Sequence, residues 1–270
     1  MKSKFVLAQL ASVGDPAVNL EKARRAMAQA YGEHHPDVIV FPECFMSFYP
    51  LNTPLETVLS VSESLDGPFV TGLREEAKKY GMWVICGICE TTGDPDDRRR
   101  YNAVVIINGE GELVGVYRKT HLYDAFGHKE SDCNKPGDRF FEPIDTPFGK
   151  LGLFVCYEVR FPEVARYQRA KGADIIVMPT AWAAGKIKSR HFHTLINARA
   201  IENAVYLLAC DQCNEASIGE SVAVDPMGIP IACAGEGECL IAATIDTDRI
   251  AEVRRKVPSF ESRRPDLYTV

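Results

Sequence analysis

Residues 152–163 read Gly-Leu-Phe-Val-Cys-Tyr-Glu-Val-Arg-Phe-Pro-Glu, an apolar run that ends at Cys156 and is followed by more polar residues. The run predicts a buried strand and, from about Phe161, a helix. A thiol at such a strand end occupies a position that α/β sheets use for function, because loops gather there. Taken alone, Cys156 is better explained as an inert thiol of the core.

Strands and helices alternate on both sides of this stretch. Strands are predicted over 4–9, 37–41, 82–89, 102–107, 113–117, 140–144, 150–155, 174–178, 205–210, 221–224 and 240–245. Helices are predicted over 19–31, 68–79, 161–170, 187–203 and 249–256. The alternation near both ends, with hairpins between, predicts an α/β fold with a mixed sheet. Without repeats or linkers, residues 1–270 are expected to form a single domain.

The composition excludes several classes of protein. The chain has 46% hydrophobic and 25% charged residues and a formal net charge of -6, which argues against nucleic acid or an anionic membrane as partner. No apolar run reaches the roughly 18 residues of a membrane helix, and the N-terminus lacks a signal-peptide pattern, so a soluble, cytoplasmic protein is expected. Nine cysteines, an odd number, favour reduced thiols over a disulfide framework.

Two other predicted strand ends carry reactive side chains. Glu43 follows the apolar strand that Pro42 stops, and Lys119 lies where the strand ending at Tyr117 gives way to a long polar loop over 120–137. Long loops in compact domains are usually functional. Each residue also has a simpler explanation, since Glu43 could cap a turn and Lys119 could be a solvated lysine.

A thiol, a carboxylate and an ammonium together suit attack on an amide carbonyl, which is a poor electrophile. The carboxylate of Glu43 can take the proton of Cys156 and pass it to the departing amine. The ammonium of Lys119, with the backbone N–H of Tyr157, can stabilise the oxyanion, and one such donor is typically worth about 3–4 kcal/mol. This chemistry requires neither a metal nor an organic cofactor.

Three blocks of the sequence resemble, in order and spacing, the signature blocks of the nitrilase (carbon-nitrogen hydrolase) superfamily. They are Pro42-Glu43, Arg118-Lys119-Thr120-His121-Leu122 and Cys156-Tyr157-Glu158-Val159-Arg160-Phe161-Pro162-Glu163. The resemblance implies a four-layer α-β-β-α sandwich, a homodimer or higher homo-oligomer, and a catalytic Glu-Lys-Cys triad at Glu43, Lys119 and Cys156. It also implies that Glu130, in the loop after the lysine, orients Lys119 and the substrate; a surface carboxylate is the alternative for Glu130.

The residues after Cys156 resemble those of Nit-type amidases, although Glu158 and Val159 replace the usual aspartate and leucine. The expected reaction is therefore hydrolysis of a small linear amide to a carboxylic acid and ammonia through a cysteine thioester. Nitrile hydrolysis and N-carbamoyl hydrolysis remain alternatives for the same triad. A silent scaffold protein would be expected to lack a triad member, and all three are present.

Weaker candidates surround these blocks. Tyr49 and Trp182 are predicted to bind substrate together with Tyr157, against the alternative that Trp182 belongs to the core. The pairs Cys86/Cys89 and Cys210/Cys213 have Cys-x-x-Cys spacing, but neither opens a helix, so no metal or redox role is expected. The run 98–100, three arginines, is expected to be a solvated hairpin loop.

Overall fold

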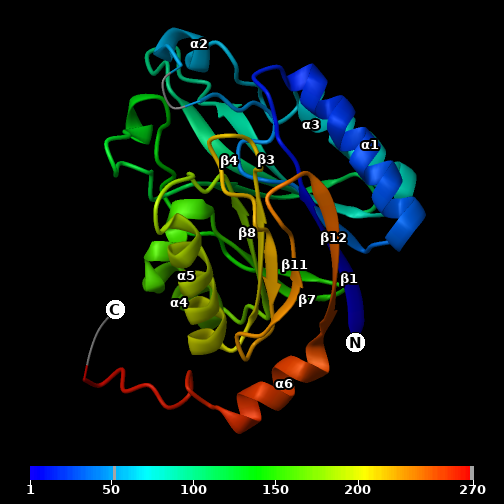
Figure 1. Cartoon of the computed structure of the whole chain (residues 1–270), viewed down its shortest axis with the longest axis vertical. Helices are drawn as coiled ribbons and strands as arrows, with labels where there is room; N and C mark the ends of the chain where they lie inside the picture. The colour runs from blue at the N-terminus through cyan, green and yellow to red at the C-terminus, as the bar shows by residue number, and fades with distance from the viewer. Residues whose placement is uncertain (51–52, 268–270) are drawn as a thin grey trace.

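The structure, a computed structural model, describes residues 1–50 and 53–267 (Figure 1). Within these residues the strands form two six-stranded mixed sheets. The first has the order β12 (Cys239–Asp246), β1 (Lys2–Gln9), β2 (Val38–Val40), β3 (Trp83–Thr91), β4 (Arg100–Ile107), β5 (Leu113–Arg118). The second has the order β11 (Pro230–Cys233), β10 (Val222–Val224), β9 (Tyr206–Asp211), β8 (Ile175–Thr180), β7 (Gly149–Leu153), β6 (Ile144–Thr146).

Parallel pairing occupies the middle of each sheet. β1, β2 and β3 run parallel to one another, and so do β7, β8 and β9. The outer strands pair with these groups in antiparallel orientation. The parallel strands are buried on both faces, as such strands usually are. Their carboxyl ends are where the chain leaves each sheet to build loops.

Helices cover the outer face of each sheet. On one side lie α1 (Pro16–His34) and α3 (Pro68–Tyr80), and on the other α4 (Pro162–Ala170) and α5 (Lys188–Asn203) (Figure 1). α1 begins where Asp15 accepts a hydrogen bond from the Ala17 N–H at 2.8 Å, with proline at the first helical position. The α/β class and the sandwich of two sheets flanked by helices are therefore confirmed.

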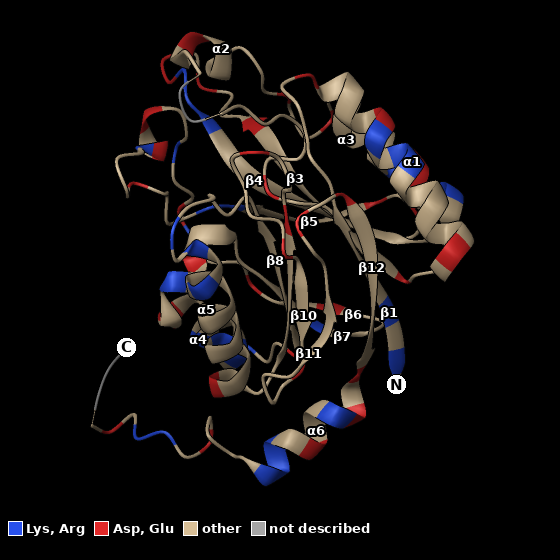
Figure 2. Ribbon diagram, in the orientation of Figure 1, with Lys and Arg blue, Asp and Glu red and all other residues tan. Residues whose placement is uncertain are grey.

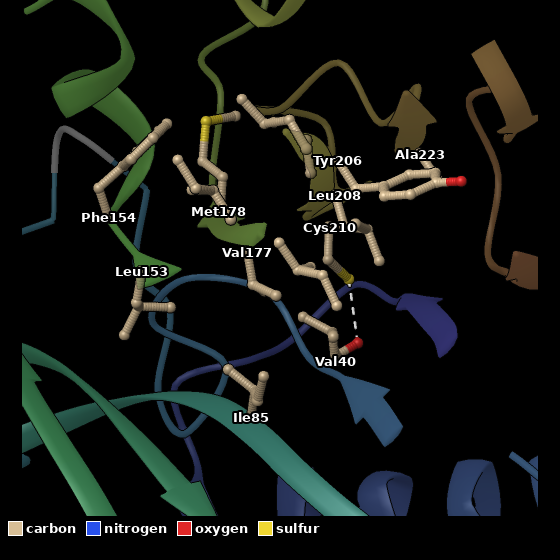
Figure 3. Close-up of a cluster of buried hydrophobic side chains, with 14 of the residues drawn as sticks. Val40, Ile85, Leu153, Phe154, Val177, Met178, Tyr206, Leu208, Cys210 and Ala223 are labelled. Atoms are coloured by element: carbon tan, nitrogen blue, oxygen red, sulfur yellow. Dashed lines mark hydrogen bonds between the residues drawn. The ribbon is translucent and has the colours of Figure 1, made fainter. Parts of the chain in front are cut away.

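The core between the sheets is apolar and contains side chains from both (Figure 3). Val40 and Ile85 come from the first sheet, whereas Leu153, Val177 and Leu208 come from the second. The Cys210 thiol donates a hydrogen bond to the Val40 carbonyl at 3.1 Å, which links the two sheets directly. A second cluster fills the space between the first sheet and helices α1 and α3.

The outward faces of the helices carry both signs of charge. Lysine, arginine, aspartate and glutamate alternate along α1 and α6 (Thr247–Lys256), as Figure 2 shows. Several form pairs one turn apart, such as Lys256 with Glu252 at 2.6 Å. Among the residues described, no helix combines the length and apolarity needed to span a bilayer.

Most predicted elements are present, with ends shifted by a few residues. The strand predicted over 140–144 is wrong for its first four residues, because Pro143 cannot donate to a ladder and pairing begins only at Ile144. Phe141 is buried nonetheless, since its carbonyl accepts from the Gln168 side chain at 2.9 Å. Elements that the sequence did not predict are α2 (Leu55–Leu59), β11, and the 3-10 helices η1 (Glu130–Asp132) and η2 (Cys156–Arg160).

The predicted solvated loop of three arginines is also partly wrong. Arg98 and Arg99 pair with Glu56 and Asp97, but Arg100 is only 6% exposed and begins β4. Its guanidinium donates to the carbonyls of Val58 and Val61 at 2.9 and 2.8 Å. Arg100 is buried because it satisfies backbone acceptors at the end of α2 and just after that helix.

Candidate active site

A cavity of about 400 Å³ opens where the carboxyl ends of the parallel strands meet. Such volumes are typical of sites for small molecules. All seven residues predicted for catalysis or substrate binding line it, although they come from six separate segments: Glu43, Tyr49, Lys119, Glu130, Cys156, Tyr157 and Trp182. The fold therefore brings together residues that are more than a hundred positions apart in the sequence.

Glu43 lies in the turn after β2 and is almost completely buried. Its Oε1 accepts from the Lys119 ammonium at 2.8 Å and from the Asn102 amide at 2.7 Å. Its Oε2 accepts from the Ala181 N–H at 2.8 Å. These donors fix the carboxylate, while Oε2 keeps the capacity to accept one more hydrogen.

Lys119 lies directly after β5 with only 2% of its surface exposed, which excludes the solvated alternative. Its ammonium donates to Glu43 and, at 2.9 Å, to Oε2 of Glu130. Burial by itself would lower the pKa of Lys119, but the carboxylates of Glu130 and Glu43 outweigh it and raise that pKa well above its ordinary value. The lysine is therefore a permanent cation on the cavity wall.

Glu130 is 6% exposed and begins η1, so the surface alternative is excluded for it as well. Besides Lys119, it accepts from the Tyr123 N–H at 2.6 Å and from the amides of Asn102 and Asn134 at 2.9 and 3.0 Å. Burial opposes ionisation, but Lys119 and these donors lower its pKa. Glu130 is thus an ionised carboxylate held by four groups.

Asn102 is the residue of this cluster that the sequence reasoning missed. Its amide nitrogen bridges the two carboxylates, donating to Glu43 and Glu130. A polar residue near the start of an otherwise apolar strand was the available signal, because a buried amide needs partners. The Asn102 amide thereby holds the carboxylates of Glu43 and Glu130 on opposite sides of the Lys119 ammonium.

Cys156 is the first residue of η2, three residues after β7 ends at Leu153, and has φ of 47°. Such a left-handed conformation is strained for a residue with a Cβ and produces a sharp turn that presents the thiol to the cavity. As the helix starts here, the N–H groups of Cys156 and Tyr157 have no acceptor within it. Burial and then the charge of Glu43 raise the pKa of Cys156 well above its ordinary value, with Lys119 opposing.

Glu158 holds the turn from behind and is fully buried. One oxygen accepts from the hydroxyls of Tyr117 and Thr120 at 2.7 Å each and from the Thr120 N–H at 3.0 Å. The other accepts from the Val155 N–H at 2.7 Å. Burial opposes its ionisation, yet His121, Thr120 and Tyr117 lower its pKa. The carboxylate ties the nucleophile turn to the end of β5.

The three residues predicted to bind substrate differ in setting. Tyr49 lies against Gly14, whose carbonyl accepts from its hydroxyl at 3.4 Å. Tyr157 contacts the ring of Tyr123 edge to face. Trp182 is 3% exposed and its indole donates to the Lys188 carbonyl at 3.0 Å, so it belongs to the core and to the cavity wall at once.

Besides Arg100, two cations line the cavity without a carboxylate partner among the residues described, and the sequence reasoning identified neither. The guanidinium of Arg160 lies 4.8 Å from the ring centre of Trp182, and its Nε is buried without an acceptor. The ammonium of Lys188 lies 3.6 Å from the ring centre of Phe126 and donates to the Tyr123 hydroxyl at 3.1 Å. Within the described ranges no group of three or more His, Cys, Asp or Glu side chains is arranged to hold a metal.

Comparisons with known proteins agree with this geometry. Residues 6–255 match the family model described as carbon-nitrogen hydrolase. The chain is 35% identical over 246 residues to the deaminated glutathione amidase of Escherichia coli O157:H7, covering 91% of each chain.

Two solved structures have the same fold. The crystal structure of Nit3 from Saccharomyces cerevisiae, a member of branch 10 of the nitrilase superfamily, superposes with a TM-score of 0.85 and 33% identity over 97% of both chains. The second structure is a mutant of the amidase from Nesterenkonia sp. AN1, with the acetamide moiety of fluoroacetamide added covalently at its active site cysteine. It superposes with a TM-score of 0.79 and 25% sequence identity, covering 98% of this chain and 95% of that one.

Proposed function

The chain belongs to the carbon-nitrogen hydrolase family, and we propose that it hydrolyses a small linear amide to a carboxylic acid and ammonia. The observation that carries the proposal is the buried Glu43–Lys119–Glu130 cluster on the wall of the cavity that Cys156 also lines. The names of the bacterial relatives, an amidase in each case, favour amides over nitriles and N-carbamoyl compounds.

The first step is formation of the nucleophile. Because its pKa is raised, the Cys156 thiol is protonated in the resting enzyme and needs a base. Glu43 takes this proton on Oε2, the oxygen that does not contact Lys119. The thiolate then attacks the amide carbon, and its charge moves to the carbonyl oxygen.

The oxyanion is stabilised by groups already in place. The Lys119 ammonium is held between two carboxylates and needs no reorganisation to donate its third hydrogen, while the Tyr157 N–H donates from the first turn of η2. Glu43 returns the proton to the amide nitrogen, ammonia leaves, and the acyl group stays on Cys156 as a thioester. Glu43 then activates water, which attacks the thioester and releases the acid.

The two unpaired cations suggest the kind of acyl group. A buried guanidinium or ammonium without a carboxylate partner is costly unless an anion binds there. Arg160 and Lys188 lie on the aromatic side of the cavity, with Trp182 and Phe126. We therefore propose an amide whose acyl chain ends in a carboxylate, with the anion at these two cations and the amide at Cys156.

A matched pair of substrates tests the proposal. Succinamate and butyramide differ only in a terminal carboxylate in place of a methyl group, and ammonia release measures both. We expect turnover of succinamate with the lower KM, loss of turnover in Cys156→Ala, and a rise in KM for succinamate but not butyramide in Lys188→Met. Turnover of the matching nitrile alone, or undiminished hydrolysis by Cys156→Ala, would reject the assignment.

A further inference from the structure

A second pair of thiols lies beside the catalytic cluster and has no part in the mechanism above. Cys44 directly follows Glu43, has φ of 51° and lines the cavity. Cys89 lies near the end of β3 and is buried. The two side chains are hydrogen-bonded to each other, and the Cys89 thiol also lies 3.5 Å from the Ser47 carbonyl, to which it donates.

The backbones that carry the two thiols are packed tightly. A Cβ at Gly87, two residues before Cys89, would lie 2.6 Å from the Cys44 nitrogen. The Met46 N–H donates to the Gly87 carbonyl at 3.1 Å, and the Gly87 N–H donates to the Pro42 carbonyl at 3.1 Å. Only glycine allows this approach, which presses the turn after Glu43 onto β3.

Arg100 supplies a positive charge near the pair. It is buried, lines the cavity, has no carboxylate partner in the described part of the chain, and its Nε lacks an acceptor. The hydrogen bond from Cys44, together with the charge of Arg100, lowers the pKa of Cys89 to about 7 against the effect of burial. Cys89 is therefore the more acidic thiol of the pair.

We propose that Cys44 and Cys89 are a modification site at which hydrogen peroxide converts two hydrogen-bonded thiols into a disulfide. Peroxide reaches Cys44 through the cavity. The Cys44 sulfur attacks one peroxide oxygen while the thiol proton passes to the departing hydroxide, so that one water leaves and a sulfenic acid forms on Cys44. The Cys89 sulfur then displaces the hydroxyl of the sulfenic acid, and the Cys89 proton joins that hydroxide to give the second water. Two thiols and one peroxide thus give one disulfide and two waters.

The disulfide would also affect the neighbouring carboxylate. Forming it shortens the contact between the sulfurs to about 2.05 Å. Because Glu43 is bonded to Cys44, its hydrogen bonds to Lys119 and Ala181 must shift with the turn. This effect on turnover rests on the proposed amidase function, whereas formation of the disulfide does not.

Peptide mapping tests the bond itself. Cys156→Ala protein is treated with peroxide, its remaining thiols are alkylated, and it is digested with trypsin, which places Cys44 in 26–74 and Cys89 in 80–98. We expect these peptides cross-linked, with fragmentation assigning the bond to Cys89 rather than Cys86. The cross-link should persist in Cys133→Ser, which removes another thiol of the cavity, and disappear in Cys89→Ala. No cross-link, or one through Cys86 or Cys133, overturns the proposal.

Turnover tests the effect on Glu43. Peroxide should lower kcat of the native enzyme at least about tenfold, the scale expected for a misplaced catalytic group, and dithiothreitol should restore it. Cys89→Ala should keep its activity under the same treatment. An equal loss of kcat in Cys89→Ala assigns the inactivation to Cys156 and overturns the proposed effect of the disulfide on Glu43. If no amide is hydrolysed before oxidation, the proposed function fails, and the peptide map still decides on the disulfide.

Discussion

The ammonium of Lys119 lies between two carboxylates, and this arrangement determines what each group can do. Without Lys119, the negative charges of Glu43 and Glu130 would repel each other. Without the two carboxylates, burial would favour the uncharged form of Lys119. Of the two carboxylates, Glu43 is the one with an oxygen, Oε2, that does not contact Lys119 and is on the side of Cys156. We therefore assign proton transfer to Glu43 and positioning of Lys119 to Glu130.

The assignment for Glu130 predicts a defined kinetic loss. Glu130→Gln keeps the shape of the side chain but removes the charge that holds Lys119, so kcat should fall about 100-fold, the cost of a catalytic group displaced by roughly 1 Å. KM should change little, because Glu130 is not expected to bind the acyl chain. Steady-state assays on one amide measure both constants. An unchanged kcat in a folded variant would contradict the positioning role.

Asp211, at the end of β9, is a second buried carboxyl close to the site. One oxygen accepts from the Trp182 N–H at 2.8 Å, and the other is buried without a partner. Burial raises the pKa of Asp211 well above its ordinary value of 3.8, and the charge of Glu43 adds to this. Burial therefore favours the protonated form of Asp211, whereas Lys119 and the surrounding donors favour the ionised form of Glu130.

A raised pKa in the folded state means that the native protein binds more protons than the unfolded chain above pH 3.8. Stability contributed by this proton is present at low pH and is lost as the pH rises. Asp211→Asn should remove that loss, so the variant should gain stability relative to wild type between about pH 5 and about pH 8. Urea unfolding at several pH values measures it. Equal pH dependence in both proteins would show that Asp211 is ionised.

At this scale the sequence was sufficient to identify the residues proposed for the chemistry and insufficient for the residues that hold them. Glu43, Lys119 and Cys156 follow strand ends within recognisable blocks. For Asn102 the only signal was a polar residue in an apolar strand, and for the Ala181 N–H there was none, because their partners come from distant segments. Arg100 was predicted wrongly for the same reason: its acceptors lie about forty residues earlier.

Among the elements, η2 depends most on a single side chain. Its left-handed first residue is costly, and the buried Glu158 carboxylate compensates by accepting donors from β5, the following loop and Val155. The short helix is thus held by an ion as well as by the apolar packing of Val159. The sequence predicted a strand directly followed by a helix and did not predict η2 between them.

Glu158→Gln should therefore unfold at lower denaturant, with a loss of about 2–4 kcal/mol, because several buried donors lose a charged acceptor. The pKa of Glu158 is lowered, so its stabilisation is present above its ordinary value of 4.5 and is lost as the pH falls through the folded pKa. The variant should lack this acid sensitivity. Glu163→Gln, at the start of α4, is the matched control. A loss no greater than that of the control would contradict the account.

For the whole molecule, the contact between the two sheets matters most, because it aligns strand ends from both halves around one cavity. Glu43 and Lys119 come from the first sheet and Cys156 and Ala181 from the second. The apolar core between the sheets therefore fixes distances in the site (Figure 3). Cutting a large side chain from this core should affect both stability and catalysis.

Ile85→Ala tests this coupling. Ile85 is fully buried between the sheets, and its truncation should cost about 2–5 kcal/mol. Val105→Ala, buried on the other face of the first sheet against the helices, should also destabilise the protein but leave kcat close to wild type. Thermal unfolding and amide hydrolysis are measured on both. A kcat unaffected by Ile85→Ala would show that the site does not depend on inter-sheet packing.

At this scale the alternation of strands and helices predicted an α/β fold but could not divide the strands between two sheets. Sheet order depends on pairing between remote segments, such as β1 with β12, which periodicity does not encode. The layered sandwich was available only through the resemblance to a family. The single domain, the homo-oligomer and the cytoplasmic location remain predictions.

The central claim is that Cys156 attacks the amide and carries the acyl group, with Glu43 as its base. Intact mass spectrometry of the native enzyme, quenched in acid during turnover of succinamate, tests it most directly. The account predicts a mass increase equal to the substrate minus ammonia, located on the peptide that contains Cys156 and absent both from Cys156→Ala and from Glu43→Gln, which lacks the base. Hydrolysis that proceeds in Cys156→Ala, or an acyl group on another residue, would contradict it.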